Sequence, residues 1–253
     1  PLVNREVLDF VDSDRGRETA LTSPLTSDHL IRTKALPLWI DDPKYEDMCK
    51  LREQISQAIR EYSAEYDAYV ERHSARLPAG LTRFDSLPRV VLMPGLGALC
   101  AGSDVTAAGI ARDITAHTLA VKARVAAMGT YLGLPEAELF DMEYQSFQHA
   151  KLGRETEPVL RRHVALITGA AGAIGSGISQ ELLEQGCHVA VTDLPGENLD
   201  SLVEELKATF PDHVLGVPLD VTDPASVAQG FAAVIQTWGG VDLVVANAGI
   251  ALV

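Results

Sequence analysis

Three glycines at three-residue intervals stand where the sequence could bind a phosphate group. In the segment LITGAAGAIG, Gly169, Gly172 and Gly175 follow an apolar run that is typical of a buried strand. The amide groups at the start of a helix are free to bind an anion. Each glycine contributes by lacking a Cβ: Gly169 for a tight turn, Gly172 for approach of a pyrophosphate, and Gly175 for packing of the helix on the strand. Such a loop alone is equally compatible with a plain turn.

A carboxylate on the next predicted strand gives this loop a more specific meaning. Asp193 ends that strand, near the spacing of about 20 residues at which an acid accepts the hydroxyls of an adenosine ribose. A carboxylate there repels a 2′-phosphate, and residues 163–206 contain no Lys or Arg that would reverse the preference. The sequence therefore predicts NAD as the cofactor, with NADP less favoured. The alternative is a structural role, in which Asp193 only forms a turn at the end of a strand.

The pattern around these residues predicts the fold that must position them. Strands are expected at residues 163–168, 188–193, 213–221 and 241–247, with helices between them at about 175–185, 198–210 and 223–238. A helix between every pair of strands implies a parallel sheet with right-handed crossovers. The predicted fold class is α/β, with a doubly wound, Rossmann-like parallel sheet in the C-terminal part.

The preceding residues predict a helix-rich α/β joining domain. Helical spacing of apolar residues runs from Tyr45 to about His73, a buried strand is expected at 89–93, and further helices are expected at 103–129 and about 135–150. Residues 94–102 predict a glycine-rich turn between strand and helix, and the first forty residues predict loop and short strand. A charged segment with a proline at 151–162 indicates a domain boundary, which gives domains 1–155 and 156–253.

Composition excludes several classes of partner. The net charge is −14, and no basic stripe of the kind that binds nucleic acid is present. No apolar run approaches the length of about 20 residues that crosses a membrane, and no secretory signal is visible. The three cysteines are isolated and odd in number, which indicates neither a disulfide framework nor a CxxC metal site and favours a reducing cytoplasm.

Residues 163–253 resemble the first half of a short-chain dehydrogenase/reductase. The resemblance is carried by TGAAGAIG, by DVTD at 220–223 and by NAG at 247–249, in this order on the predicted strands one, three and four. It implies that Asp220 and Val221 border the adenine, and that Asn247, Ala248 and Gly249 line the nicotinamide ribose. The predicted cofactor-binding residues are therefore Gly169, Ala171, Gly172, Ile174, Gly175, Asp193, Leu194, Asp220, Val221, Asn247, Ala248 and Gly249.

One departure from the family pattern leaves an alternative open. The common loop is TGxxxGxG, and Ala173 stands here at its middle glycine. The spacing GxxGxxG also occurs in the extended branch, which includes sugar-nucleotide epimerases and dehydratases. A further alternative is a dinucleotide-binding scaffold module without catalysis. We favour a dehydrogenase because NAG and the joining region suit it better.

The catalytic residues that the resemblance implies are missing from residues 163–253. Family members use a serine and a Tyr-xxx-Lys pair on the fifth strand and the helix after it, and the lysine lowers the tyrosine pKa. Residues 163–253 contain no tyrosine. We therefore assign no catalytic residue, and we expect an internal piece that ends after the fourth strand and is inactive by itself.

Residues 1–155 resemble the middle of bifunctional proteins that join a class II aldolase to a short-chain dehydrogenase. The segments TSDHLIRTKALPLWI, RVVLMPGLGALCAG and AELFDMEYQSFQHAKLG carry this resemblance, which is to the rhamnulose-1-phosphate aldolase/lactaldehyde dehydrogenase type. It implies rhamnose metabolism, in which aldol cleavage of a sugar phosphate yields a small aldehyde that NAD oxidises. It also implies a small-molecule substrate and a homo-oligomer for the full-length protein.

The aldolase metal site is not expected in this chain. Such a site needs a His-x-His pair, and the seven histidines include none. We assign no metal ligand and expect a divalent metal such as zinc only in an upstream aldolase domain. His29, in a predicted polar loop, could contact a sugar phosphate, although a solvated loop is favoured. His117 and tyrosines 62, 66 and 69 are interpreted as packing residues, and the loop at 94–102 as a structural connection rather than a phosphate cradle.

Overall fold

The chain folds into two units, which the computed structural model describes over residues 1–151 and 158–249. One unit comprises Pro1–Gly102 and Thr106–Arg154, and the other comprises Ser103–Val105 and Glu155–Val253. The predicted boundary between residues 155 and 156 lies outside the described residues and stays a prediction. Among the described residues, no helix has the length and apolar composition that a membrane span requires.

The C-terminal unit contains a parallel sheet of four strands. They are β4 (Val164–Thr168), β5 (His188–Asp193), β6 (Val214–Pro218) and β7 (Leu243–Val245), in the order β6-β5-β4-β7. Helices α8 (Ala173–Glu184), α9 (Glu197–Thr209) and α10 (Pro224–Trp238) connect successive strands. The predicted fold class is confirmed, and the order places β4 at the point where the direction of winding reverses.

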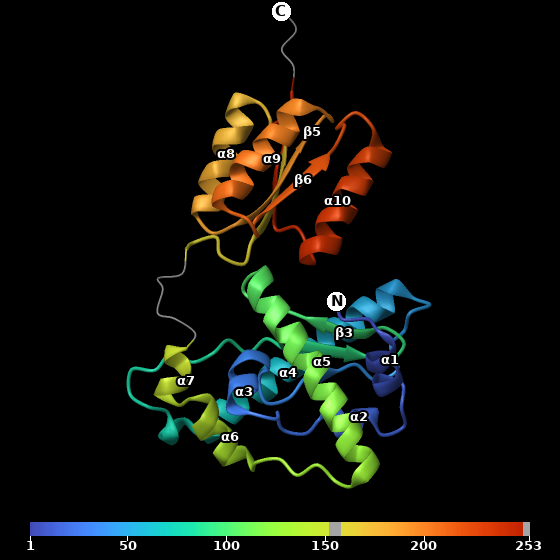
Figure 1. The fold of residues 1–253 in the computed structure, drawn as a ribbon, viewed down its shortest axis with the longest axis vertical. Helices are drawn as coiled ribbons and strands as arrows, with labels where there is room; N and C mark the ends of the chain where they lie inside the picture. The colour runs from blue at the N-terminus through green and yellow to red at the C-terminus, as the bar shows by residue number, and fades with distance from the viewer. Residues whose placement is uncertain (152–157, 250–253) are drawn as a thin grey trace, which may run out of the picture. The chain divides into compact units, whose positions relative to one another are not determined.

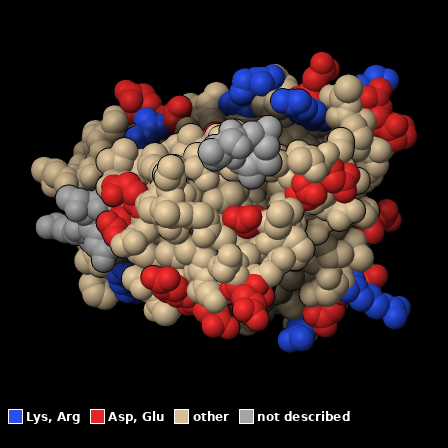
Figure 2. Space-filling model, turned by 90° about the horizontal axis from the view of Figure 1, so that it is seen from above, with Lys and Arg blue, Asp and Glu red and all other residues tan. Residues whose placement is uncertain are grey.

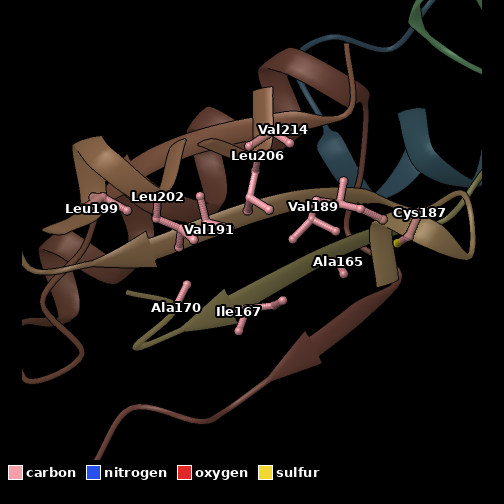
Figure 3. Packing of buried hydrophobic residues seen from close by; sticks show 11 residues of the cluster. Ala165, Ile167, Ala170, Cys187, Val189, Val191, Leu199, Leu202, Leu206 and Val214 are labelled. Carbon is pink, nitrogen blue, oxygen red and sulfur yellow. The ribbon is translucent and has the colours of Figure 1, made fainter. Parts of the chain in front are cut away.

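Helices cover both faces of this sheet (Figure 1). On one face, Ile167 and Val191 pack with leucines of α8 and α9, as Figure 3 shows for Leu199, Leu202 and Leu206. On the other face, Leu166, Ala190 and Val217 pack with Val234 of α10. Burial on both faces explains why the strands read as continuous apolar runs rather than as alternating ones.

The start of α8 lies unusually close to the end of β4. A Cβ added at Gly175 would lie 2.4 Å from the carbonyl O of Gly169 and 2.7 Å from the Cα of Ala170. Two residues farther along the same helix, Gly177 faces open space, with no heavy atom within 4 Å of an added Cβ. Of these two glycines on one helix, only Gly175 is packed too closely for a side chain.

The N-terminal unit combines short helices, two long helices and a small sheet. Its elements are α1 (Arg5–Val11), α2 (Gly16–Ala20), α3 (Ser27–Thr33), β1 (Leu38–Trp39), α4 (Met48–Arg72), η1 (Ser74–Arg76), β2 (Val90–Met93), β3 (Gly97–Cys100), α5 (Val105–Met128), α6 (Glu136–Glu143) and α7 (Ser146–Ala150). Strand β2 lies between β1, which is parallel to it, and β3, which is antiparallel. The predicted helices at 45–73 and 103–129 are present with slightly shorter bounds.

Three predictions for this unit are wrong. Residues 94–102 form the turn and second strand of a β2–β3 hairpin, with Gly95 and Gly97 at φ +77° and +107°. The first forty residues contain three helices instead of mainly loop, because side chains such as Asn4 and Thr26 cap helix starts. The helix expected at 135–150 is two helices, because Gln145 adopts an extended backbone between them.

We expect opposite effects from alanine at the two glycines of α8. Gly175→Ala should lower the free energy of unfolding of the C-terminal unit by about 1–3 kcal/mol, because its methyl group collides with backbone. Gly177→Ala should raise it by up to about 1 kcal/mol, because alanine favours helix and finds open space. Urea unfolding followed by circular dichroism measures both. Equal effects of the two substitutions would contradict the close packing of α8 on β4.

A second prediction concerns His188, which is buried in β5. Its ring stacks on that of His213 with 4.3 Å between centroids, and its Nε2 atom has no hydrogen-bond partner within the described residues. Burial, and then the nearby His213, lower the pKa of His188 to about 4.

Because the folded state disfavours protonated His188, stability should be full above pH 6.5 and fall as the pH drops from about 6.5 to about 4. With allowance for solvent screening, the loss should be about 1–2 kcal/mol. His188→Phe should flatten this part of the pH profile of urea unfolding, read from Trp238 fluorescence in a Trp39→Phe background. An unchanged slope in the variant would exclude His188 as its source.

Candidate cofactor-binding site

The loop between β4 and α8 leaves the first amide groups of α8 uncovered. Gly172 is the N-cap residue of α8, with φ −78° and ψ 161°, and no side chain makes a capping hydrogen bond there. An added Cβ at Gly172 meets only the Gly169 carbonyl O, at 3.4 Å. The next residue but one, Ile174, is 72% exposed. The helix end therefore has the free donors and the clear approach that an anion requires.

Gly169 makes the turn that brings this helix end into place. Its φ of +64° is in the left-handed region, where an L side chain is strained. An added Cβ would also lie 2.8 Å from the Cα of Ala248, which follows β7. Both the conformation and the contact therefore require glycine at this position.

Asp193, at the end of β5, is directly connected to the loop. Its Oδ2 accepts a hydrogen bond from the amide of Ala171 at 2.9 Å, and its Oδ1 accepts one from the amide of Leu194 at 2.8 Å. These bonds hold the carboxylate beside the start of α8. They also mean that the Ala171 amide is already used and is not one of the free donors of the loop. The Leu194 side chain is 59% exposed next to this carboxylate.

Asp220 and Val221 follow β6, which pairs with β5 on the side opposite to β4. The Asp220 carboxylate accepts hydrogen bonds from the hydroxyl and the amide of Thr222, at 2.7 and 2.8 Å, and these bonds lower its pKa. The Asp220 amide donates to the Ser226 hydroxyl at 3.0 Å. Because its carboxylate is already hydrogen-bonded within a turn, Asp220 would border a ligand mainly by steric contact. The half-exposed Val221 adds an apolar surface beside it.

Asn247 connects the segment after β7 to the glycine loop, and its expected place beside a nicotinamide ribose stays a prediction. Both protons of its side-chain amide are used inside the protein, in bonds of 3.0 Å to the carbonyl O atoms of Thr168 and Gly169. The Thr168 hydroxyl in turn accepts from the amides of Asn247 and Ala248, at 3.1 and 3.0 Å. The side chain of Asn247 thus clamps the end of β7 to the glycine loop.

Thr168 is a positioning residue of the loop that the sequence does not single out. Its hydroxyl and its carbonyl hold the Asn247–Ala248 backbone and side chain together. The available signal was its position: a hydroxyl residue on the last position of the strand that leads into the loop. That signal becomes informative only when β7 is known to be the neighbour of β4.

All twelve predicted cofactor-binding residues gather at one edge of the sheet. They follow β6, β5, β4 and β7 in spatial order, at the carboxyl ends where ligands of doubly wound folds bind. Figure 2 looks onto the molecule from above, and Asp and Glu side chains are spread over the face that it shows. The site therefore combines the uncapped start of α8 with the Asp193 and Asp220 carboxylates and the exposed side chains of Ile174 and Leu194.

The candidate residues of the N-terminal unit are not arranged as a site. His29 lies on α3 rather than in a polar loop, because Thr26 accepts a hydrogen bond from the His29 amide and caps that helix. Its ring meets that of His117 edge-on at 6.0 Å, and burial lowers its pKa. Among the residues that the structure describes, no cluster of three His, Cys, Asp or Glu side chains has a geometry for a metal ion.

Comparison with known proteins identifies relatives along the whole chain. An "Uncharacterized oxidoreductase YuxG" of Bacillus subtilis is 33% identical over 249 residues, which is 97% of this chain and 36% of the relative. The "3-oxoacyl-[acyl-carrier-protein] reductase FabG" of Thermotoga maritima is 40% identical over 91 residues, 36% of this chain and 37% of the relative. The chain thus spans about a third of the length of these curated relatives.

Similar solved structures and matching family models are also found. A Brucella melitensis 3-ketoacyl-(acyl-carrier-protein) reductase complexed with NADH is 32% identical, with 35% of this chain and 34% of that chain covered and a TM-score of 0.31. Residues 163–253 match the model of the short chain dehydrogenase family. Residues 3–152, more than half of the chain, match the model described as aldolase class II, second domain. The chain therefore belongs to the family of class II aldolase second domains, here followed by a short-chain dehydrogenase domain.

Proposed function

We propose that this chain is the joining and cofactor-binding part of an NAD-dependent short-chain dehydrogenase/reductase fused to a class II aldolase. The observation that carries the proposal is the uncapped start of α8 beside the Asp193 carboxylate. A helix end without a side-chain cap retains donors for a pyrophosphate. The family matches on both sides of residue 155 support the fusion.

The residues present fit the parts of a nicotinamide dinucleotide. In the proposal, the amides at the start of α8 hold the pyrophosphate, with Gly172 keeping the approach clear. Asp193 and Leu194 face the adenosine ribose, Asp220 and Val221 border the adenine, and Asn247, Ala248 and Gly249 lie toward the nicotinamide ribose. When bound, the cofactor supplies a hydride acceptor. The chain's own residues bind and orient it, and none of them is assigned a catalytic role.

Charge supports NAD over NADP. The Asp193 carboxylate would lie near a 2′-phosphate and would repel it, and both of its oxygens are held in place by backbone amides. Residues 163–206 provide no Lys or Arg to bind such a phosphate. Residues 158–253 contain 11 Asp and Glu against three Lys and Arg, and this negative charge acts in the same direction.

We further propose that the full-length protein oxidises a lactaldehyde-like aldehyde or alcohol after aldol cleavage of a sugar phosphate, as in rhamnose metabolism. The fusion supports this, because a reactive aldehyde would be consumed by the protein that forms it. The aldolase metal, a divalent ion such as zinc, would lie in an upstream aldolase domain. Short-chain dehydrogenases are often oligomeric, which supports a homo-oligomer, and the three free thiols support a cytoplasmic location.

A titration with NAD and NADP tests the proposed cofactor site. The chain should bind NAD more tightly than NADP by isothermal titration calorimetry. Asp193→Asn keeps the size of the side chain and one hydrogen-bond acceptor but removes the charge. The substitution should weaken NAD binding about tenfold, because a hydrogen bond between a ribose hydroxyl and a charged group is lost. It should also reduce the preference for NAD over NADP, because the carboxylate that repels the 2′-phosphate is gone.

Glu204→Gln provides the matched control for this titration. Glu204 is exposed on α9, and its substitution removes the same charge as Asp193→Asn. Because an exposed charge is screened by solvent, the affinity for NAD should stay within about twofold of that of the unchanged chain. Equal weakening by the two variants would show a general charge effect, and equal affinity of the unchanged chain for NAD and NADP would reject the NAD assignment.

A further inference from the structure

The N-terminal unit contains a cleft of about 670 Å³ that the proposed dehydrogenase function does not use. One face of α4 forms one wall, through residues that recur at helical spacing from Ala58 to Arg72. The other walls come from the segments 17–23, 35–41 and 133–139. The volume is within the range of about 300–1,000 Å³ that is typical of small-molecule sites.

Aromatic rings form much of the inner surface of this cleft. Trp39, Tyr62, Tyr66 and Tyr69 line it, together with leucines and a proline. Tyr66 and Tyr69 direct their hydroxyls away from the cleft, because both donate to the fully buried carboxylate of Glu143, at 2.8 and 3.0 Å. Their rings therefore face the cleft and cannot turn without leaving Glu143 unpaired.

Further contacts hold the tyrosine side chains of the cleft in place. The Tyr66 hydroxyl also contacts the Tyr144 hydroxyl at 2.9 Å, and the Tyr62 hydroxyl donates to the Leu36 carbonyl O at 2.8 Å. The Lys34 ammonium lies 3.5 Å from the centroid of the Tyr66 ring, from a position that does not line the cleft. Because the Tyr66 ring already pairs with Lys34, Trp39, Tyr62 and Tyr69 provide the remaining aromatic surface of the cleft.

Carboxylates outnumber cations around the cleft. Asp41, Glu61, Glu65 and Glu136 line it with only two arginines. Arg17 pairs with Asp41, and Arg72 is shared between Glu65 and Glu136. Glu61 accepts a hydrogen bond from the Gln57 amide, and no Lys or Arg of the described residues forms an ion pair with it. The cleft therefore carries a net negative charge, with Glu61 free to pair with a ligand.

A polar side chain without a partner lies in the same cleft. Ser23 is 7% exposed, and its hydroxyl has no hydrogen-bond partner within the described part of the chain. A buried hydroxyl in this state costs free energy until a ligand or a water satisfies it. Ser23 is thus a buried polar group without a partner among the described residues, beside the apolar lining residues.

We propose that this cleft binds a small organic cation, an ammonium or guanidinium group carried on a compact apolar body. The apolar body lies on the rings of Trp39, Tyr62 and Tyr69, and the positive charge faces Glu61. Aromatic faces attract cations, and the attraction grows when the cation is partly removed from water. An anionic ligand would meet the excess of carboxylates, and a neutral one would leave Glu61 without a counter-ion.

Choline and 3,3-dimethylbutan-1-ol form a matched pair of probes, because they share size and shape and differ in charge. Trp39 lines the cleft, so its fluorescence reports binding in a Trp238→Phe background. We expect choline to bind about tenfold more tightly than the neutral alcohol. Glu61→Gln should weaken choline binding about threefold to tenfold and leave the alcohol unchanged.

Glu53→Gln is the control, because Glu53 is exposed on the same helix and does not line the cleft. It should leave the affinity for choline within about twofold of the unchanged chain. Equal affinities of choline and the alcohol would overturn the proposal. So would the absence of choline binding up to about 20 mM, because a preformed site should bind a small ligand with a lower dissociation constant than that. Equal weakening by Glu53→Gln and Glu61→Gln would overturn it as well.

Discussion

In the C-terminal unit, backbone from three segments meets at one point with no room for a side chain, and the rest of the unit depends on this contact. Gly169 turns the chain at the end of β4, and Gly175 lets α8 approach that turn. After β7, Ala248 lies against Gly169 and the Asn247 side chain lies against Gly175. A Cβ at either glycine would collide with backbone. The amide groups at the start of α8 remain open because no capping side chain lies there, so the capacity to bind an anion arises from missing atoms.

A set of hydrogen bonds keeps this contact in register. Thr168 and Asn247 join β4 to the segment after β7, and Asp193 joins the end of β5 to the loop through the Ala171 amide. Three neighbouring strands are thus connected to the loop by side-chain hydrogen bonds. The arrangement orients the loop before a ligand arrives, which lowers the entropy cost of binding.

The N-terminal unit is organised around a buried carboxyl group, that of Glu143. Glu143 at the end of α6 is fully buried, and burial raises the pKa of its carboxyl. Two tyrosine hydroxyls of α4 satisfy its oxygens, which makes its burial tolerable and ties α4 to α6. The position of the aromatic rings that line the cleft therefore depends on a residue outside the cleft.

Local sequence pattern was sufficient for the fold of the C-terminal unit but not for that of the N-terminal one. Strands buried on both faces appear as unbroken apolar runs, so β4 to β7 and the helices between them could be predicted within a few residues. Helix α3 could not, since the polar segment SDHLIRT becomes helical by capping with Thr26 and by burying Leu30 and Ile31. The hairpin at 94–102 depends on pairing of β3 with β2 and on contact with Leu2, which local pattern does not contain.

The same division applies to the candidate site. Residue types and spacing determined by themselves that a glycine turn, a helix start and an acid meet at the end of a parallel sheet, because each is set within one or two elements. Only the tertiary structure decided which donors stay free. The side-chain amide of Asn247 and the amide of Ala171 are both used inside the protein, by partners 79 and 22 residues away. A hydrogen bond between segments so far apart depends on how strands are ordered in space, and the order β6-β5-β4-β7 exists only in the folded chain.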